Sequence, residues 1–129
     1  MSVSPIGNTG SRLDLRIRQG GTFEFSIALK NPDGTPINLT GATLSAQIRR
    51  TGLAPNPAVA TFAIVVTSAV NGQASLSLTD AITAVITCGE TETEKASRYV
   101  WDLELLDSAA RVVPLLFGDV AVFREVTRV

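Results

Sequence analysis

The stretch Arg12–Arg50, RLDLRIRQGGTFEFSIALKNPDGTPINLTGATLSAQIRR, decides the fold because its apolar residues occupy alternate positions. Leu13, Leu15 and Ile17 alternate with charged residues, and the alternation resumes after Gly20-Gly21. Successive side chains of a strand point to opposite faces of a sheet, so this period of two predicts strands buried on one side. The predicted strands cover residues 12–18, 23–30 and 43–49, with a turn at 31–36. This part of the chain therefore predicts an antiparallel β-domain.

The rest of the chain continues the β pattern with one interruption. The apolar run over 58–67 is rich in β-branched residues, which favours a single strand over a helix. Asn71-Gly72 then predicts a hairpin turn, since both residues tolerate a positive φ. A short helix is expected to begin at Thr79 or Asp80 and to end before Gly89. Further strands are predicted over 73–78, over 98–107 and over 112–126, the last broken or bulged at Gly118.

The chain has 129 residues, which fits one domain with a core of its own. Seven to eight strands at this spacing, with one short helix, predict a single antiparallel β-sandwich over residues 12–129. Residues 1–11, MSVSPIGNTGS, lack the basic start and apolar core of a secretory signal, so we expect a flexible N-terminal arm. No apolar run approaches the roughly 18 residues that a transmembrane helix needs.

The composition argues against several classes of function. A net charge of −1 gives no general affinity for nucleic acid or for an anionic membrane. The chain has no histidine, which removes histidine-activated nucleophiles and the commonest transition-metal ligand. Its single cysteine, Cys88, allows no intrachain disulfide, which suits assembly in a reducing cytoplasm. What remains on composition is carboxylate, lysine or hydroxyl chemistry; the sequence offers no convincing acid–base pair for a hydrolase, and we expect no cofactor.

Three features invite a functional interpretation and have a simpler alternative. Glu90, Glu92 and Glu94 lack the fixed spacing and turn glycine of a calcium loop, so a solvated loop is the better interpretation than a metal site. Trp101 lies on an alternating apolar face, which favours the sandwich core over a ligand platform. Cys88 has apolar neighbours and is expected to be buried rather than reactive.

A row of arginines is the candidate interface. Arg12, Arg16 and Arg18 share one face of their predicted strand, and Arg49 is expected near them on a neighbouring strand. Guanidinium groups make paired hydrogen bonds to carboxylates and phosphates, so the row is suited to an acidic partner surface. The alternative is a solvent-facing row that keeps the sheet from aggregating.

Several segments, taken in order, resemble a family of small virion proteins of tailed bacteriophages. These proteins are similar to the N-terminal domain of phage baseplate upper proteins. The resemblance covers Leu13 to Arg128, and its best motifs are Gln19-Gly20 with Thr22-Phe23, DGTPINLTGAT (33–43), Trp101-Asp102-Leu103 and Glu125-Val126-Thr127-Arg128. One departure is the acidic GETETEKAS segment (89–97), where a short turn before the aromatic strand is expected. As a second departure, we expect no receptor-binding or trimerising extension after Val129.

The resemblance implies an immunoglobulin-like sandwich that binds other virion proteins and catalyses nothing. The expected role is docking to tail, baseplate or neck proteins, in a homo-oligomer within a virion assembled in the bacterial cytoplasm. One alternative is a capsid decoration protein that binds the major capsid protein and stabilises the head shell. A remote alternative is a carbohydrate-binding β-sandwich, for which exposed aromatic side chains would be the mark.

Overall fold

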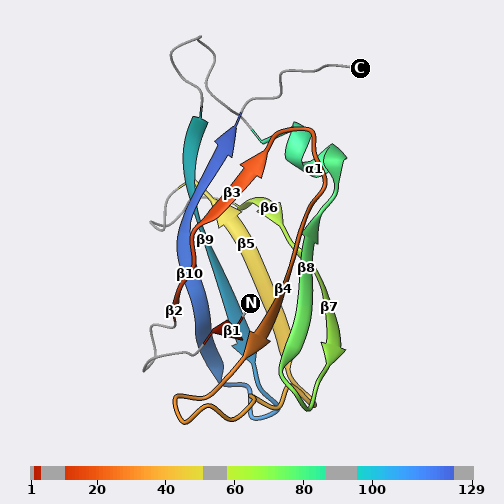
Figure 1. The fold of residues 1–129 in the computed structure, drawn as a ribbon, viewed down its shortest axis with the longest axis vertical. Helices are drawn as coiled ribbons and strands as arrows, with labels where there is room; N and C mark the ends of the chain where they lie inside the picture. The colour runs from red at the N-terminus through yellow and green to blue at the C-terminus, as the bar shows by residue number, and fades with distance from the viewer. Residues whose placement is uncertain (1, 4–10, 51–57, 87–95, 124–129) are drawn as a thin grey trace.

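The computed structural model describes residues 2–3, 11–50, 58–86 and 96–123, which form a sandwich of two β-sheets (Figure 1). The smaller sheet has the strand order β1-β4-β8-β7, with strands Ser2–Val3, Phe23–Leu29, Gln73–Leu78 and Ala63–Ser68. The larger sheet has the order β2-β10-β9-β5-β6, with strands Ser11–Arg12, Val112–Phe123, Ala96–Leu106, Thr43–Arg49 and Ala58–Thr61. Strand β3, Leu15–Arg18, pairs with β10 beyond β2. The expected all-β sandwich is confirmed.

The order of the strands matches an immunoglobulin variable-type sandwich. Strands β4, β8 and β7 take the places of B, E and D, and β10, β9, β5 and β6 take those of G, F, C and C′. Antibody domains join strands B and F by a disulfide. Here the Phe25 ring on β4 meets the Trp101 ring on β9, edge to face, with 5.9 Å between ring centroids. An aromatic contact thus joins the two sheets where antibody domains have a covalent bond.

The alternation seen in the sequence correctly predicts the core. Leu15 and Ile17 of β3 are buried, as are Trp101 and Leu103 of β9. The other strands contribute Ile27, Leu29, Ala46, Ile48, Ala60, Ala74, Leu76, Leu78, Leu116, Val120 and Val122. A helix begins where expected, as α1, Asp80–Ala84, and the Thr79 hydroxyl accepts a hydrogen bond from the Ile82 N–H. It ends at Ala84, earlier than the predicted end before Gly89.

The apolar run over 58–67 forms two strands in different sheets, so the prediction of one strand is wrong. Strand β6 pairs with β5 in the larger sheet, whereas β7 pairs with β8 in the smaller sheet. Phe62 lies between them, and its N–H donates to the Ala46 carbonyl while its ring is buried. Burying this ring between the sheets turns the chain from one layer to the other, which a period-two pattern does not reveal.

The last strand is continuous through Gly118, where a break or bulge was expected. Gly118 pairs with Trp101 inside the β9–β10 ladder, and the register shift lies between Pro114 and Leu116 instead. Leu115 and Leu116 are both buried, which is typical of an extra residue in one strand. Gly118 is needed for a different reason, its contact with the N-terminal strand described below.

The N-terminal residues that the structure describes are paired. Ser2–Val3 runs parallel to β4, with Ser2 opposite Ala28, and Ser11 lies opposite Leu116 of β10. Residues 4–10 of the predicted arm lie outside the described part of the chain. So do Cys88 and the three glutamates at 90, 92 and 94, whose expected roles remain predictions.

Candidate functional site

The outer face of the larger sheet, which we call the docking face, carries a row of polar and aromatic side chains. Arg12 of β2 lies opposite Phe117 of β10, Phe117 lies opposite Asp102 of β9, and Asp102 lies opposite Gln47 of β5. Residues that pair across a ladder point to the same face of the sheet. The four side chains therefore stand side by side across the sheet, although they come from four separate segments of the chain.

A groove of about 350 Å³ opens along this row. It is lined by Arg12, Gln47, Arg49, Val100, Trp101, Asp102, Phe117, Gly118 and Asp119. Two arginines and two aspartates thus border an apolar floor, and Phe117 keeps 37% of its surface exposed. Nothing in the sequence pattern singled out Phe117, because it becomes notable only through its neighbours on other strands.

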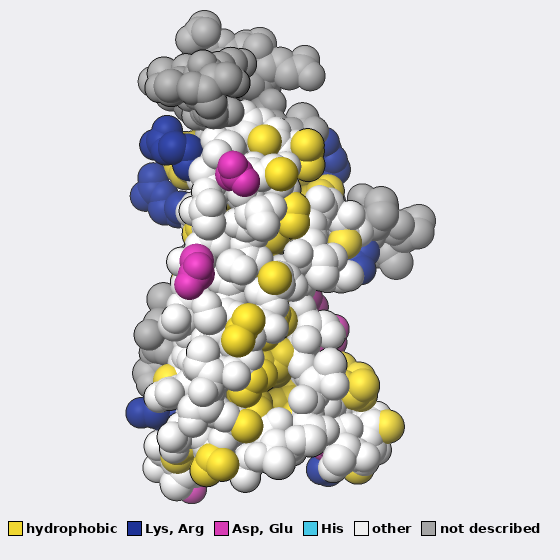
Figure 2. Space-filling view, turned by 90° about the vertical axis from the view of Figure 1, so that its right-hand side faces the viewer, with side chains coloured by type: hydrophobic (Ala, Val, Ile, Leu, Met, Phe, Trp, Pro, Cys, Tyr) yellow, Lys and Arg dark blue, Asp and Glu magenta, His cyan; other side chains and the backbone are white. Residues whose placement is uncertain are grey.

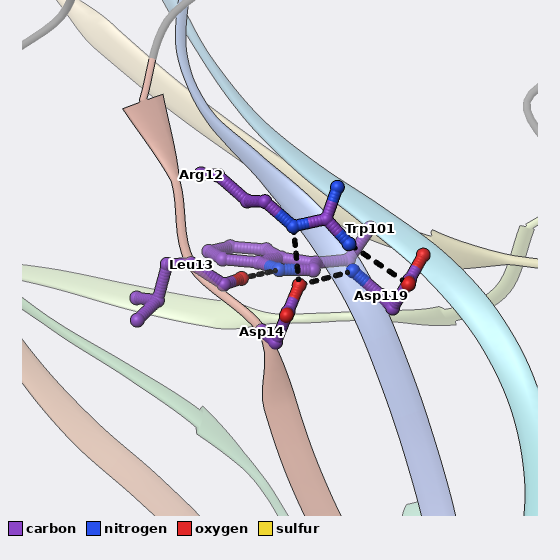
Figure 3. A network of polar contacts seen from close by, with 5 residues as sticks. All are labelled: Arg12, Leu13, Asp14, Trp101 and Asp119. Atoms are coloured by element: carbon purple, nitrogen blue, oxygen red, sulfur yellow. Dashed lines mark hydrogen bonds and ion pairs between the residues drawn. The ribbon is translucent and has the colours of Figure 1, made fainter.

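Arg12 is held in place by carboxylates from two directions (Figure 3). Its Nε lies 3.1 Å from Asp14 Oδ1, and its second terminal nitrogen lies 2.8 Å from Asp119 Oδ2. Asp14 Oδ1 also accepts a hydrogen bond from the backbone N–H of Asp119, at 2.9 Å. The guanidinium carbon lies 6.0 Å from the centre of the Phe117 ring. These contacts therefore hold the Arg12 guanidinium in one orientation at the edge of the groove.

The same network joins the N-terminal strand to the last strand. Trp101 Nε1 donates a hydrogen bond to the Leu13 carbonyl, at 2.7 Å, between β2 and β3 (Figure 3). The Leu13 N–H donates to the Phe117 carbonyl at 2.8 Å. Trp101 is only 3% exposed, so its indole supports the groove from below, and its expected place in the core is confirmed.

Across the groove, Arg49 and Asp102 both line the larger sheet's outer face. Arg49 donates a hydrogen bond to Gln47 Oε1 at 2.6 Å. Partial loss of hydration in the groove raises the pKa of Asp102, the nearby charge of Glu104 adds to this, and the positive charge of Arg49 opposes it. By contrast, the N–H of Asp119 and then the charge of Arg12 hold the pKa of Asp14 below its usual value.

These two aspartates should make opposite contributions to the pH dependence of stability. Asp14 has a lowered pKa, so its stabilising effect is present above the usual value of 3.8 and is lost as the pH falls through the folded-state pKa. Asp102 has a raised pKa, so its charge destabilises the fold at neutral pH. We expect Asp14→Asn to be less stable than wild type at neutral pH and Asp102→Asn to be more stable. The Asp102 difference should shrink as the pH falls towards the usual value of 3.8, whereas the Asp14 difference should shrink only below that value.

Urea unfolding of the three proteins between acid and neutral pH tests this prediction. Each asparagine has nearly the size of the aspartate that it replaces, so the two variants control for each other. Curves that stay parallel to the wild-type curve at every pH would show that neither carboxylate titrates differently in the folded state.

A second hollow of about 220 Å³ lies further along β3 and is lined by Arg16, Ile17, Arg18 and Phe123. The guanidinium carbon of Arg16 is 4.9 Å from the centre of the Phe123 ring, which is a cation–π contact. Ala121 of β10 pairs with Arg16 on one side and with Arg98 on the other. The small alanine thus leaves two arginines facing each other across the outer surface.

The structure separates the four predicted interface arginines into two places on one face. Arg12 borders the larger groove and Arg16 and Arg18 border the smaller one, all from the N-terminal segment. Arg49 borders the larger groove from β5, with β10 and β9 lying between β5 and the N-terminal strands. The sequence analysis missed Arg98, whose polar position in its strand was visible but whose proximity to Arg16 depends on the strand order. The interface role of these arginines remains a prediction.

The structure shows no constellation for metal chemistry in residues 11–50, 58–86 and 96–123. No three histidine, cysteine, aspartate or glutamate side chains in these ranges are placed to hold a metal ion. In the same residues, no helix is long and apolar enough to cross a membrane.

Comparisons with known proteins give one structural neighbour to report. No protein-family model matches the chain, and no curated protein matches it in sequence. Among solved structures, it is similar to the N-terminal domain of phage TP901-1 ORF48, with a TM-score of 0.48 and 13% sequence identity. The match covers 97% of this chain and 95% of that one. The two sequences are too different for any residue of that domain to indicate a role here.

Proposed function

We propose that the chain is a non-enzymatic structural protein of a tailed-phage virion, which docks onto tail, baseplate or neck proteins through the docking face. The observation that carries this proposal is the fixed guanidinium of Arg12 beside the exposed ring of Phe117. Arginine and aromatic residues are enriched in protein interfaces, where they act as anchors. Residues 13–128 resemble tailed-phage virion proteins, and this resemblance suggests that the assembly is a phage virion.

The prearranged side chains suit binding without a large change of conformation. Ordering a long side chain at an interface costs about 0.5–1.5 kcal/mol, and Arg12 is already ordered by Asp14 and Asp119. Arg16 is likewise held over Phe123. A partner surface therefore meets cations whose positions are set by the fold, at a lower entropic cost.

The partner should present acidic side chains to the smaller groove. Arg16 and Arg18 line it, Arg98 lies across Ala121 from Arg16, and guanidinium groups bind carboxylates in pairs of hydrogen bonds. A virion repeats one interface around a symmetry axis, so modest contacts in each copy add up to firm attachment. The absence of histidine from the chain agrees with a role in binding rather than catalysis.

Reversing one charge in the smaller groove tests this docking face. We expect Arg16→Glu to weaken attachment at least about tenfold, because a like charge would then face the acidic partner. The measurement is the number of copies in virions purified from a host that supplies only the variant, by quantitative mass spectrometry. Arg111→Glu is the matched control, since Arg111 is an exposed arginine in the β9–β10 turn whose ion pair with Asp107 lies on the surface.

The possible outcomes test the docking face and the virion role independently. Equal incorporation of Arg16→Glu and wild type would overturn the docking face while leaving the virion role. Absence of the wild-type protein from particles would overturn the virion role itself. A cryo-electron density map of the same particles assigns the location, and density on the capsid lattice would replace tail docking by capsid decoration.

A further inference from the structure

The edge strand β7, Ala63–Ser68, ends the smaller sheet, and its pairing with β8 is regular from Ala63 to Val66, with a register shift only before Ser68. Among the described residues it pairs with β8 alone. Its sequence, AIVVTS, contains no charge and no proline, and Val65 and Val66 are 62% and 42% exposed. An edge strand presents unpaired N–H and C=O groups, and proteins normally block such an edge with charges, proline, bulges, shortness or a cover. The register shift in β7 lies at its end, beyond Val66, so the run Ala63–Val66 is left without such a block.

The other sheet edges that the structure describes do carry such protection. Strand β3 has the charges of Arg16 and Arg18, and β6 is only four residues long. The far edge of the smaller sheet is covered in part by β1, and the neighbouring strand β4 carries Glu24. Figure 2 shows hydrophobic side chains running down the side of the molecule on which β7 and β8 lie. The open edge is thus specific to β7.

We infer that β7 pairs with β7 of a second copy of this chain, antiparallel and about a two-fold axis. Ile64, Val65, Val66 and Thr67 are consecutive β-branched residues, which favour the extended conformation. An uncharged strand can meet itself without placing like charges opposite one another. Two copies of β3, by contrast, would bring their arginines together. The pairing would join the two smaller sheets into one continuous sheet.

The two-fold axis also limits the register of this pairing. Val65 lies opposite Ser75 and points to the outer face of the sheet, whereas Ile64 and Val66 lie opposite the buried Leu76 and Ala74 and point inward. Opposite residues in an antiparallel pair share a face, so the axis must pass through a residue rather than between two. An axis at Val65 places Val65 opposite its own copy and Ile64 opposite Val66. The inner apolar layer would then continue across the joint.

This inference concerns a different surface from the docking face, so either proposal can fail without the other. A two-fold contact uses the same surface on both copies and closes, so it yields a dimer rather than a chain of molecules. The second strand would also cover the most exposed part of the apolar edge, which is otherwise a site for aggregation.

Sedimentation velocity of the purified full chain, from micromolar to near-millimolar concentration, tests the inference. We expect a monomer–dimer equilibrium in the wild type. Val65→Lys and Val65→Glu should each weaken the dimer at least about tenfold, because identical charges would meet on the axis. Val65→Thr keeps a β-branched, uncharged side chain and should still dimerise. An equimolar mixture of Val65→Lys and Val65→Glu should restore the dimer, since opposite charges then face each other.

Circular dichroism and thermal unfolding of each variant establish that the monomers fold alike, as expected at an exposed position. A wild type that stays monomeric throughout the range would overturn the inference. So would a dimer that survives in Val65→Lys, or open polymers in place of a dimer. A Val65→Lys and Val65→Glu mixture that stays monomeric would exclude the proposed register.

Discussion

Replacing Trp101 with alanine is expected to lower the free energy of unfolding by about 3–5 kcal/mol. The indole is 3% exposed, and its ring meets those of Phe25 and Phe62 with 5.9 and 5.8 Å between centroids. Alanine would leave a cavity between the sheets, where antibody domains have a disulfide. It would also leave the Leu13 carbonyl without the hydrogen bond that Trp101 Nε1 donates.

Chemical unfolding followed by circular dichroism measures this loss. Trp101→Phe separates the two causes, because it keeps an aromatic ring but removes the N–H group. Phe117→Ala is the control for an exposed aromatic on the same sheet, and it should cost far less. A Trp101→Ala protein that loses less than about 1 kcal/mol would show that the aromatic contact contributes little to joining the sheets.

Replacing Gly118 with alanine should destabilise the protein by about 3 kcal/mol, the upper end of the usual range for overpacking. A Cβ atom at this position would lie 2.2 Å from the Leu13 carbonyl oxygen and 2.7 Å from its carbon. Both are backbone atoms, so the contact is relieved only by moving the N-terminal strand away from β10. Asp14 Oδ1, at 2.9 Å from the same Cβ, would be displaced as well.

Hydrogen exchange of the Gly118→Ala protein should show the amide protons of β3 exchanging faster while those of β8 keep their protection. Gly21→Ala is the matched control, because the nearest atom to its Cβ would be the Arg18 carbonyl oxygen at an ordinary 3.5 Å. That variant should stay within about 0.5 kcal/mol of wild type. Equal stability of the two variants would contradict the close approach of Leu13 to Gly118.

Together these residues explain how the docking face is built. Trp101 and Gly118 hold the segment around Leu13 against β10, and this places Arg12 beside Asp119, more than a hundred residues away in sequence. Variants that loosen the segment should therefore weaken docking and stability together. Arg16→Glu, in contrast, should weaken docking far more than stability, because Arg16 is exposed and its replacement removes only the cation–π contact with Phe123, worth about 0.5–1 kcal/mol at exposed sites.

Much of the fold could be predicted from the local pattern of apolar and polar residues. The alternation in 12–18, 43–49 and 98–107 correctly predicted which side chains are buried, because the strand period is set by the backbone itself. The hairpin turn that ends at Gly72 and the helix cap at Thr79 were likewise visible, since each depends on the conformational preferences of a few neighbouring residues. Gly72 takes the expected positive φ of 67°, whereas Asn71 does not.

The tertiary structure alone decided which strands are neighbours. The apolar run at 58–67 is divided between two sheets because Phe62 is buried between them. The side chains that bury Phe62 come from other segments, so the run alone does not reveal the division. The neighbours of Arg98 and Phe117 on the docking face depend on the order β2-β10-β9-β5, which joins distant segments. By itself, the sequence determined most of the strands and their buried faces, because these follow from short-range sterics and a period of two. Only long-range packing selected the pairing and register that place arginines, aspartates and an exposed phenylalanine on one surface.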